Sequence, residues 1–222
     1  MSDRMTSAAL TRMARCAAEE IRSHHALLSQ LDSACGDGDH GTTMIRLIER
    51  VANEVEVAPG MPLRTVFKDA GWQLLGGDGG ASGALLGAFV LGMAADSPEA
   101  DSEMGSLEVD SALEAGLRNC RRYTQAAPGD KTLLDALVPA LAAFSSAAGR
   151  GASLADALRE AALAAQAGAE ATRHMTTRAG RGRNLGDRTL GHQDPGATSV
   201  ALLFKGFYQG FIGSERGTEH AG

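Results

Sequence analysis

Three carboxylates, three glycines, one histidine and three hydroxyl side chains are gathered within residues 31–44. The three acids are Asp32, Asp37 and Asp39. Carboxylate oxygens are the hard ligands that Mg2+ takes, usually together with the phosphates of a substrate. The interleaved glycines let the backbone turn tightly enough to aim all three side chains at one point. This segment therefore predicts a metal and phosphate site.

A calcium loop and a simple helix cap both fit the acidic segment less well. A calcium loop with Asp37 and Asp39 at its first and third positions would place Gly41, Thr42 and Ile48 where such loops carry Asp or Asn, Gly and Glu. A cap for a helix that begins near Thr42 needs one Asp rather than three. We therefore interpret the segment as a metal site at the start of a helix.

Two more loops lie directly before predicted helices. The glycine-rich stretch 76–84 leads into a helix whose free N–H groups and dipole favour phosphate, although glycines alone also mark a flexible turn. It is not a Walker loop, because no Gly-Lys-Ser/Thr follows. In the stretch 129–132, a helix cap at Thr132 beside a solvated Lys131 is favoured over a ligand role.

The segment before the last predicted helix contains five arginines: Arg173, Arg178, Arg181, Arg183 and Arg188. Planar guanidinium groups suit phosphate oxygens, and a solvated basic loop fits the pattern equally well. Asp194 and Pro195 then form a helix start, with the acid as N-cap and proline in the first turn. Together, the loops would form a nucleotide site if their helix ends converge at one end of a bundle.

Apolar spacing predicts the helices that must position these loops. Every apolar stripe steps by three and four and none alternates by two, so we expect an all-α fold without a convincing strand. The predicted helices cover about 13–31, 44–55, 62–76, 82–95, 107–123, 132–144, 154–169 and 195–211. We expect a single domain over residues 1–222, with a core of about 8–213, a solvated loop at 95–105 and a disordered tail at 214–222.

Composition narrows the class of protein. The chain has 222 residues, 44% of them apolar, and a formal net charge of −6; this suits a buried core and does not suit a nucleic-acid binder. No signal segment opens the chain and no apolar run approaches the roughly 18 residues of a membrane span, so a cytoplasmic location is expected. Cys16, Cys35 and Cys120 lack paired spacing, which predicts free thiols.

Four separated motifs resemble the L subunit of dihydroxyacetone kinase. Over about residues 10–211 they follow in the family's order: Gly-Asp-Gly-Asp-His-Gly-Thr at 36–42, Ala-Ser-Gly at 81–83, Gly-Asp-Lys-Thr at 129–132 and Gly-His-Gln-Asp-Pro-Gly-Ala at 191–197. The resemblance implies a barrel of eight antiparallel helices, with a nucleotide and two Mg2+ ions held by Asp32, Asp37 and Asp39 in the loops at one end. The residues that it places against ADP or ATP are His40, Gly41, Thr42, Thr43, Ala81, Ser82, Leu133, Arg181, Asp194, Pro195 and Gly196.

The same resemblance implies that this chain is half of an enzyme. In that family a separate K subunit holds the ketose, so this chain would supply the Mg-nucleotide for phosphoryl transfer to dihydroxyacetone or a related short ketose. Arg181 would be the catalytic residue, spreading charge in the transition state. The donor would be ATP, or a phosphohistidine carrier, the M subunit, that recharges bound ADP. No membrane or nucleic-acid partner is expected, and a homodimer is left open.

Two departures from the family pattern bear on the substrate. Leu133 stands where many members have Met, a change that keeps the volume needed to line an adenine pocket. Residues 180–186 read Gly-Arg-Gly-Arg-Asn-Leu-Gly in place of Gly-Arg-Ala-Ser-Tyr-Leu-Gly, which affects a closing loop or the ketose partner. Two alternatives stay open: the nucleotide domain of a fatty-acid kinase, which normally continues into further domains, and a nucleotide-sensing module that docks on a regulator without catalysis.

Overall fold

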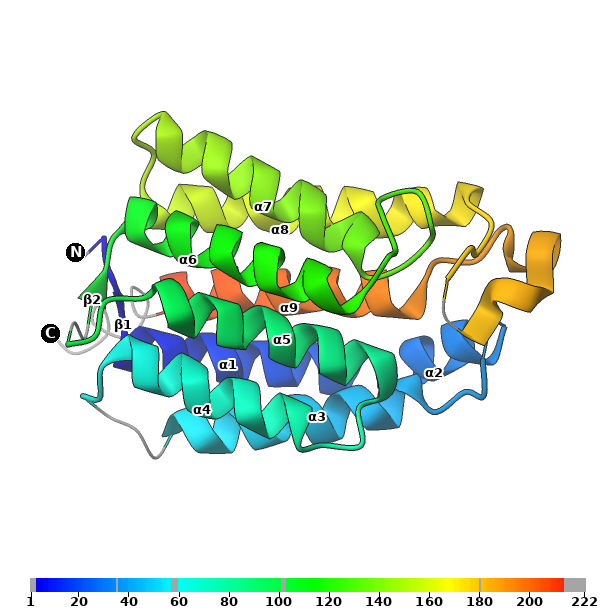
Figure 1. Cartoon of the computed structure of the whole chain (residues 1–222), viewed down its shortest axis with the longest axis horizontal. Coiled ribbons are helices and arrows are strands. Elements are labelled where there is room, and N and C mark those ends of the chain that lie inside the picture. The colour runs from blue at the N-terminus through cyan, green and yellow to red at the C-terminus, as the bar shows by residue number, and fades with distance from the viewer. Residues whose placement is uncertain (1–2, 35, 57–59, 101–102, 180, 214–222) are drawn as a thin grey trace, which may run out of the picture.

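The computed structural model describes residues 3–34, 36–56, 60–100, 103–179 and 181–213, and for 181, 182, 184 and 185 the backbone alone. Within these residues the fold is all-α apart from one pair of two-residue strands, β1 (Met5–Thr6) and β2 (Glu103–Met104) (Figure 1). The α-helices are α1 (Ser7–Ser23), α2 (His25–Ser33), α3 (His40–Glu56), α4 (Leu63–Leu75), α5 (Gly80–Asp96), α6 (Ser106–Cys120), α7 (Leu134–Gly149), α8 (Leu154–Ala171) and α9 (Pro195–Ile212). Short 3-10 helices cover Arg121–Tyr123, Thr172–His174 and Arg181–Thr189.

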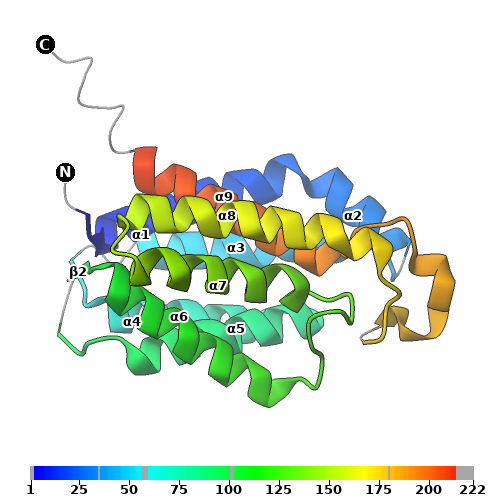
Figure 2. The same ribbon diagram turned by 90° about the horizontal axis from the view of Figure 1, so that it is seen from above.

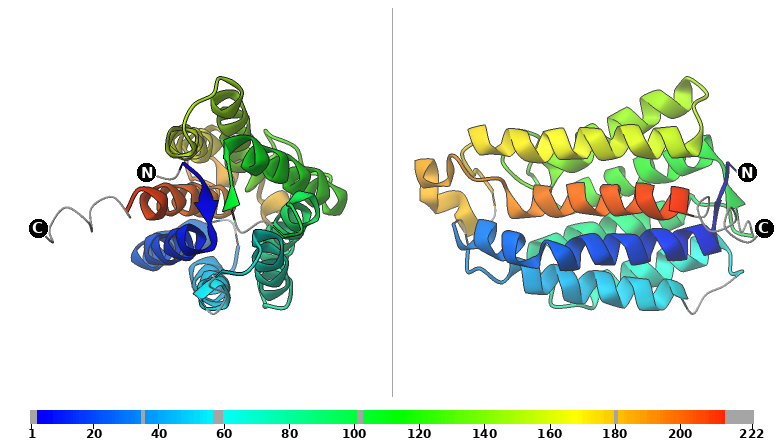
Figure 3. Two further views of the ribbon diagram at one scale, coloured as in Figure 1. Left: turned by 90° about the vertical axis from the view of Figure 1, so that its left-hand side faces the viewer. Right: turned by 180° about the vertical axis from the view of Figure 1, so that it is seen from behind.

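The long helices close into a ring. From α3 to α9 each helix packs on the next along the chain, and α1 packs on both α3 and α9 (Figure 3). Small residues allow the close approach: a Cβ on Gly210 would lie 2.5 Å from the Cα of Met13, and one on Gly116 would lie 2.8 Å from the carbonyl oxygen of Phe89. Glycine at these positions therefore lets neighbouring helices pack tightly.

Successive long helices run in opposite directions, which gives the molecule two different ends (Figures 1 and 2). The helices α3, α5, α7 and α9 all begin at the end drawn on the right of Figure 1. Residue 3 and the end of α9 lie at the opposite end, beside β1 and β2. Four helices therefore point the positive ends of their dipoles toward the same end of the ring.

The strand pair corrects the expectation of a purely helical chain. Met5 pairs with Met104, and the two side chains are 3% and 0% exposed. The expected solvated loop at 95–105 is therefore wrong at Met104, and also at Ser97, which is buried. Two-residue strands are too short for period-two alternation to show in a sequence.

The predicted first helix is broken, because α1 ends at Ser23 and α2 begins at His25. His24 has φ −107° and ψ 13°, outside the helical region, and its ring Nδ1 lies 2.8 Å from the carbonyl oxygen of Glu20. The same carbonyl also accepts the helical hydrogen bond from the N–H of His24 at 3.2 Å, so the ring and the backbone of His24 share one acceptor where the helix breaks. The other seven helices are confirmed in place, although α7 begins at Leu134 and continues to Gly149.

Two expectations fall on residues that the structure does not describe. Cys16 and Cys120 are free thiols, as predicted, whereas Cys35 lies outside the described part. The predicted disordered tail at 214–222 also lies outside it. No described helix is both long and apolar enough to cross a bilayer. The single-domain boundaries stay a prediction.

Candidate metal and anion site

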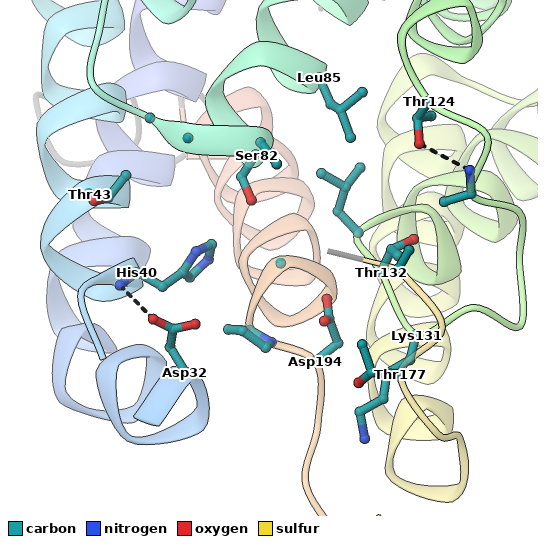
Figure 4. Close-up of a pocket in the computed structure, with 18 of the residues that line it drawn as sticks. Asp32, His40, Thr43, Ser82, Leu85, Thr124, Lys131, Thr132, Thr177 and Asp194 are labelled. Carbon is teal, nitrogen blue, oxygen red and sulfur yellow. Dashed lines mark hydrogen bonds between the residues drawn. The ribbon is translucent and has the colours of Figure 1, made fainter. Parts of the chain in front are cut away.

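A pocket opens where the N-terminal ends of α3, α5, α7 and α9 meet (Figure 4). Its volume is about 240 Å3, and a residue at or next to the start of each helix lines it: His40, Gly80, Leu133 and Pro195. The first N–H groups of a helix have no partner inside the helix, and the dipole adds partial positive charge there. Four such ends around one pocket favour an anionic ligand such as a phosphate group.

Asp32, Asp37 and Asp39 form a carboxylate cluster on the α3 side of this pocket. One oxygen from each carboxylate lies within 4.8 Å of the other two. Asp32 is fixed at the end of α2, because its Oδ2 accepts hydrogen bonds from the N–H groups of Gly38 at 3.0 Å and His40 at 3.3 Å. Gly38 has a φ of 81°, a conformation that favours glycine. These oxygen donors fit the Mg2+ that the sequence predicts.

His40 links the start of α3 to α9. Its Nε2 lies 2.8 Å from the Oγ of Ser199, and both side chains are buried. Burial lowers the pKa of His40 below its usual value, although the nearby charge of Asp32 acts in the opposite direction. A neutral imidazole therefore joins two of the helix ends without adding charge to the pocket.

The glycine-rich turn before α5 forms another wall. Gly80 has a φ of 54°, and a Cβ on Gly79 would lie 2.7 Å from a methyl carbon of Leu47. Larger residues would therefore push the turn away from α3. The residues of α5 that line the pocket are Gly80, Ala81, Ser82 and Leu85. The turn therefore lines the pocket, and its role toward phosphate stays a prediction.

The loop before α7 corrects the favoured interpretation of Lys131. Its side chain is 1% exposed rather than solvated, and its Nζ donates hydrogen bonds to the carbonyl oxygens of Met175, Thr189 and His192, at 3.1, 2.5 and 2.7 Å. Thr132 is not the N-cap, which is the next residue along the chain. A cation that binds three carbonyl groups holds separate segments together, which loop composition alone does not reveal.

Asp135 organises the same loop and was missed in the sequence. It is 4% exposed; its Oδ1 accepts from the N–H of Gly129 at 2.5 Å, and its Oδ2 accepts from the N–H of Thr132 at 2.7 Å. The spacing of Thr132 and Asp135 matches a capping box, and this pattern could have identified the acid. The turn that carries Lys131 is therefore held from the first turn of α7.

Asp194 caps α9, as predicted. Its Oδ2 accepts from the N–H of Ala197 at 2.7 Å, and its own N–H donates to the Oγ1 of Thr172 at 2.8 Å. Burial raises the pKa of Asp194 from 3.8 to about 7, the hydrogen bond from Ala197 lowers it, and the neighbouring charge of Asp135 raises it. This carboxyl group therefore titrates near neutral pH in the wall of the pocket.

Exposed arginines gather in the loops and 3-10 segments at this end of the ring. We call them the basic rim: Arg121, Arg122, Arg173, Arg178, Arg183 and Arg188. Several arginines outside these segments are paired, as in Arg64 with Glu99 and Arg150 with Glu160, whereas within the described residues no ion pair involves the rim. The rim is therefore positive on a chain that is acidic as a whole.

The structure brings most predicted site residues together. Those in the pocket wall are Asp32, Asp39, His40, Thr43, Ala81, Ser82, Leu133, Asp194, Pro195 and Gly196. Gly41 and Thr42 are not in this wall: a Cβ on Gly41 would lie 2.5 Å from the carbonyl oxygen of His25, and the Thr42 hydroxyl lies 3.1 Å from the ring Nε2 of His25. The side chain of Arg181 lies outside the described part, so its role stays a prediction.

Several wall residues were not selected from the sequence. They are Asp78, Leu85, Thr124, Ala126, Thr177 and Ala179. Most of them lie in loops with no repeating pattern, and they become neighbours only when the helix ends meet. Leu85 belongs to the apolar stripe of its helix and could not be separated from the core by spacing alone.

The fold and the site define the class of the protein as a helical ring with a candidate metal and anion pocket at one end. The chain belongs to the DAK2 domain family, which it matches over residues 34–209. The resemblance carried by the four motifs and the all-α fold are thereby confirmed.

Two relatives that are named as DhaL subunits align with this chain over most of their length. It is 37% identical over 193 residues to the ADP-binding subunit DhaL of PEP-dependent dihydroxyacetone kinase 1 from Listeria innocua, covering 86% of this chain and 90% of the relative. It is 34% identical over 178 residues to the ADP-binding subunit DhaL of the PEP-dependent dihydroxyacetone kinase of Escherichia coli, covering 80% and 84%.

A solved structure shares the fold. The crystal structure of the dihydroxyacetone kinase from C. freundii in complex with AMP-PNP and Mg2+ matches with a TM-score of 0.69 at 29% identity. The match covers 90% of this chain and 34% of that chain, so this protein spans about a third of the longer relative.

Proposed function

We propose that this chain is the nucleotide-binding subunit of a cytoplasmic kinase for dihydroxyacetone or a related short ketose. The observation that carries the proposal is the meeting of four helix N-termini beside a cluster of three carboxylates. Phosphates favour the first feature, and the Mg2+ that accompanies them favours the second. Relatives that are named as ADP-binding subunits support the same ligand.

Asp32, Asp37 and Asp39 would hold two Mg2+ ions. Carboxylates and nucleotide phosphates carry charges of the same sign, so they can share one pocket only with cations between them. When bound, the ions would neutralise charge that develops on the phosphoryl oxygens during transfer. The hydrogen bonds from Gly38 and His40 to Asp32 keep one of these ligands in position before metal arrives.

The remaining predicted residues would hold the nucleotide. In the first turn of α3 the N–H groups of His40 and Thr43 already donate to Asp32 and Asp39. The N–H groups of Gly41 and Thr42, the Thr43 hydroxyl, and Ala81 and Ser82 in the first turn of α5 would therefore donate to phosphates. Leu133, Leu85 and Ala126 give the pocket an apolar side suited to a base. Asp194, Pro195 and Gly196 complete the wall at α9, and Arg181 would spread transition-state charge.

The acceptor and the donor would come from partner proteins. No feature of the described pocket would capture a ketose carbonyl, so we assign that task to a separate K subunit. Both DhaL relatives are named as subunits of PEP-dependent kinases. We therefore favour an ADP that stays bound and is recharged by a phosphohistidine carrier, the M subunit, over exchange with free ATP.

A reconstituted assay tests the proposal. The chain would be mixed with a K subunit, Mg2+, dihydroxyacetone and either ATP or a PEP-fed phosphohistidine carrier, and dihydroxyacetone phosphate would be measured. We expect product only when chain and K subunit are both present, and faster formation with the carrier than with ATP. Product from the chain alone, or none in any combination despite a folded chain, would overturn the proposal.

A further inference from the structure

Lys131 joins two segments that are far apart in the sequence. It follows the turn at Gly129, and its Nζ binds carbonyl oxygens at Met175, Thr189 and His192. We call residues 175–179 and 181–192 the closing segment; they run from the end of the 3-10 turn after α8 to the residues before α9. The carbonyls bound by Lys131 come from both ends of this segment, so one ammonium group fixes its entry and its exit.

The conformation of Lys131 suits this task. Its φ is 60°, in the left-handed region that non-glycine residues rarely adopt, and the side chain is 1% exposed. A buried ammonium group is costly unless polar groups replace its water, and three carbonyl dipoles provide that replacement. A residue held in a strained backbone with its charge buried is a recurring feature of functional segments.

Two weaker hydrogen bonds support the same arrangement, one between the closing segment and the loop of Lys131 and one within the closing segment. The N–H of Arg178 donates to the carbonyl oxygen of Asp130 at 3.1 Å, directly before Lys131. Inside the closing segment, the N–H of Thr177 donates to the Oγ1 of Thr189 at 3.1 Å. Thr177 and Ala179 belong to the pocket wall (Figure 4). A change at Lys131 would therefore reach the pocket through residues that line it.

We propose that Lys131 is a positioning residue whose ammonium group fastens the closing segment against the α7 side of the pocket, so that the segment retains the bound nucleotide. The proposal depends on the proposed function only for the identity of the ligand. The fastening itself is a property of the chain and can be measured without nucleotide. Lys131 does not act on phosphate in this assignment, because its ammonium group is directed to backbone carbonyls.

The first experiment removes the charge and keeps the length of the side chain. In Lys131→Met we expect trypsin to cut after Arg178, Arg183 and Arg188 at least about tenfold faster than in the wild type, the size expected when charged hydrogen bonds are lost. Cleavage after Arg159, on α8, should change little. Mg-ADP should dissociate at least about tenfold faster. Lys68→Met, at an exposed lysine of α4, is the matched control and should match the wild type.

A purely structural role would give a different pattern. Tryptic cleavage would rise equally at Arg159 and in the closing segment, and ADP dissociation at a temperature well below unfolding would stay as in the wild type. Either result would overturn the proposal. If the wild type binds no Mg-ADP while Lys131→Met still loosens the closing segment alone, the proposed function fails and the fastening stands.

A second experiment uses the wild type, in case Lys131→Met does not fold. The chain has three lysines, and Lys68 and Lys205 are exposed. With an amine-acetylating reagent, mass spectrometry should show Lys131 modified at least about a hundredfold more slowly than Lys68, because reaction requires the closing segment to open. Saturating Mg-ADP should slow the modification of Lys131 further. Equal rates at Lys131 and Lys68 would contradict the proposal.

Discussion

The Nε2 of His40 and the Oγ of Ser199 lie 2.8 Å apart and connect the first residue of α3 to the second turn of α9. The two helices begin on different sides of the pocket, and both residues are buried. This contact therefore fixes the distance between the metal side of the site and the wall formed by Asp194.

Ser199→Ala removes that hydrogen bond and leaves a buried ring nitrogen without this partner. We expect a loss of about 1–2 kcal/mol in the free energy of unfolding and a melting temperature lower by about 2–8 °C for a chain of this size. Thermal unfolding followed by circular dichroism measures both. Ser111→Ala, which removes an exposed bond to Asp96, should shift the melting temperature much less. Equal shifts would contradict a structural role for the buried contact.

Asp39→Asn removes one charge from the carboxylate cluster and keeps its shape. Two like charges about 4 Å apart repel by roughly 4 kcal/mol at an effective dielectric near 20, so ADP binding to the wild type should weaken by orders of magnitude when Mg2+ is chelated. In Asp39→Asn, Mg2+ should strengthen ADP binding far less. Calorimetric titration with and without chelator measures this coupling, which must be the same in both directions. Asp187→Asn, outside the cluster, should behave as the wild type.

Asp194 predicts a dependence of stability on pH with a definite sign. Its folded pKa of about 7 lies above the usual 3.8, so the folded chain holds a proton there that the unfolded chain has released. Its contribution is present in full below about pH 4 and is lost as the pH rises to about 7, a total on the order of 4 kcal/mol. The charged neighbours Asp135 and Lys131 act in opposite directions on this pKa.

Urea unfolding of the metal-free wild type and Asp194→Asn from pH 4 to pH 8 tests this sign. The stability of the wild type relative to Asp194→Asn should fall between pH 4 and pH 7 and then become constant. A relative stability that rises over this range would show that the carboxylate is ionised in the folded state.

The basic rim predicts salt-sensitive association with an acidic face of a partner. In the reconstituted assay with a limiting concentration of K subunit, the double variant Arg173→Glu, Arg188→Glu should form dihydroxyacetone phosphate about tenfold or more slowly than the wild type at low ionic strength. The difference should shrink as salt is added. ADP affinity should not change, because neither arginine lines the pocket. Arg159→Glu, on α8, is the control. A loss that salt does not alter would argue against electrostatic association.

Most of the fold could be predicted, because the spacing of apolar residues in the sequence indicates where the helices lie. Asp194 was identified as an N-cap, and its side chain accepts a hydrogen bond from the N–H three residues on. The break at His24 could not be predicted, since neither glycine nor proline marks it. The pairing of Met5 with Met104 depends on two segments about a hundred residues apart, which leaves no local pattern.

The candidate site also has one part that could be predicted from the sequence and one part that could not. Asp32, Asp37 and Asp39 lie close together in the sequence, so their common role is visible without a structure. Lys131 was misjudged because its partners are backbone carbonyls of a segment more than forty residues away, and carbonyls have no residue type that a sequence could show. Burial of a charge by main-chain groups is a property of the path of the chain, not of its composition.

Both ends of the described chain lie opposite the pocket, which sets a reach requirement for any domain joined to this one (Figure 1). At 1.5 Å per residue, the 17 residues of α1 extend for about 25 Å along the ring. A tethered domain that delivers a substrate to the pocket must cover that distance with its own body or with about eight extended linker residues. In a fusion of this chain to a substrate-holding domain whose body does not cover this distance, shortening the linker below about eight residues should therefore abolish transfer within one molecule.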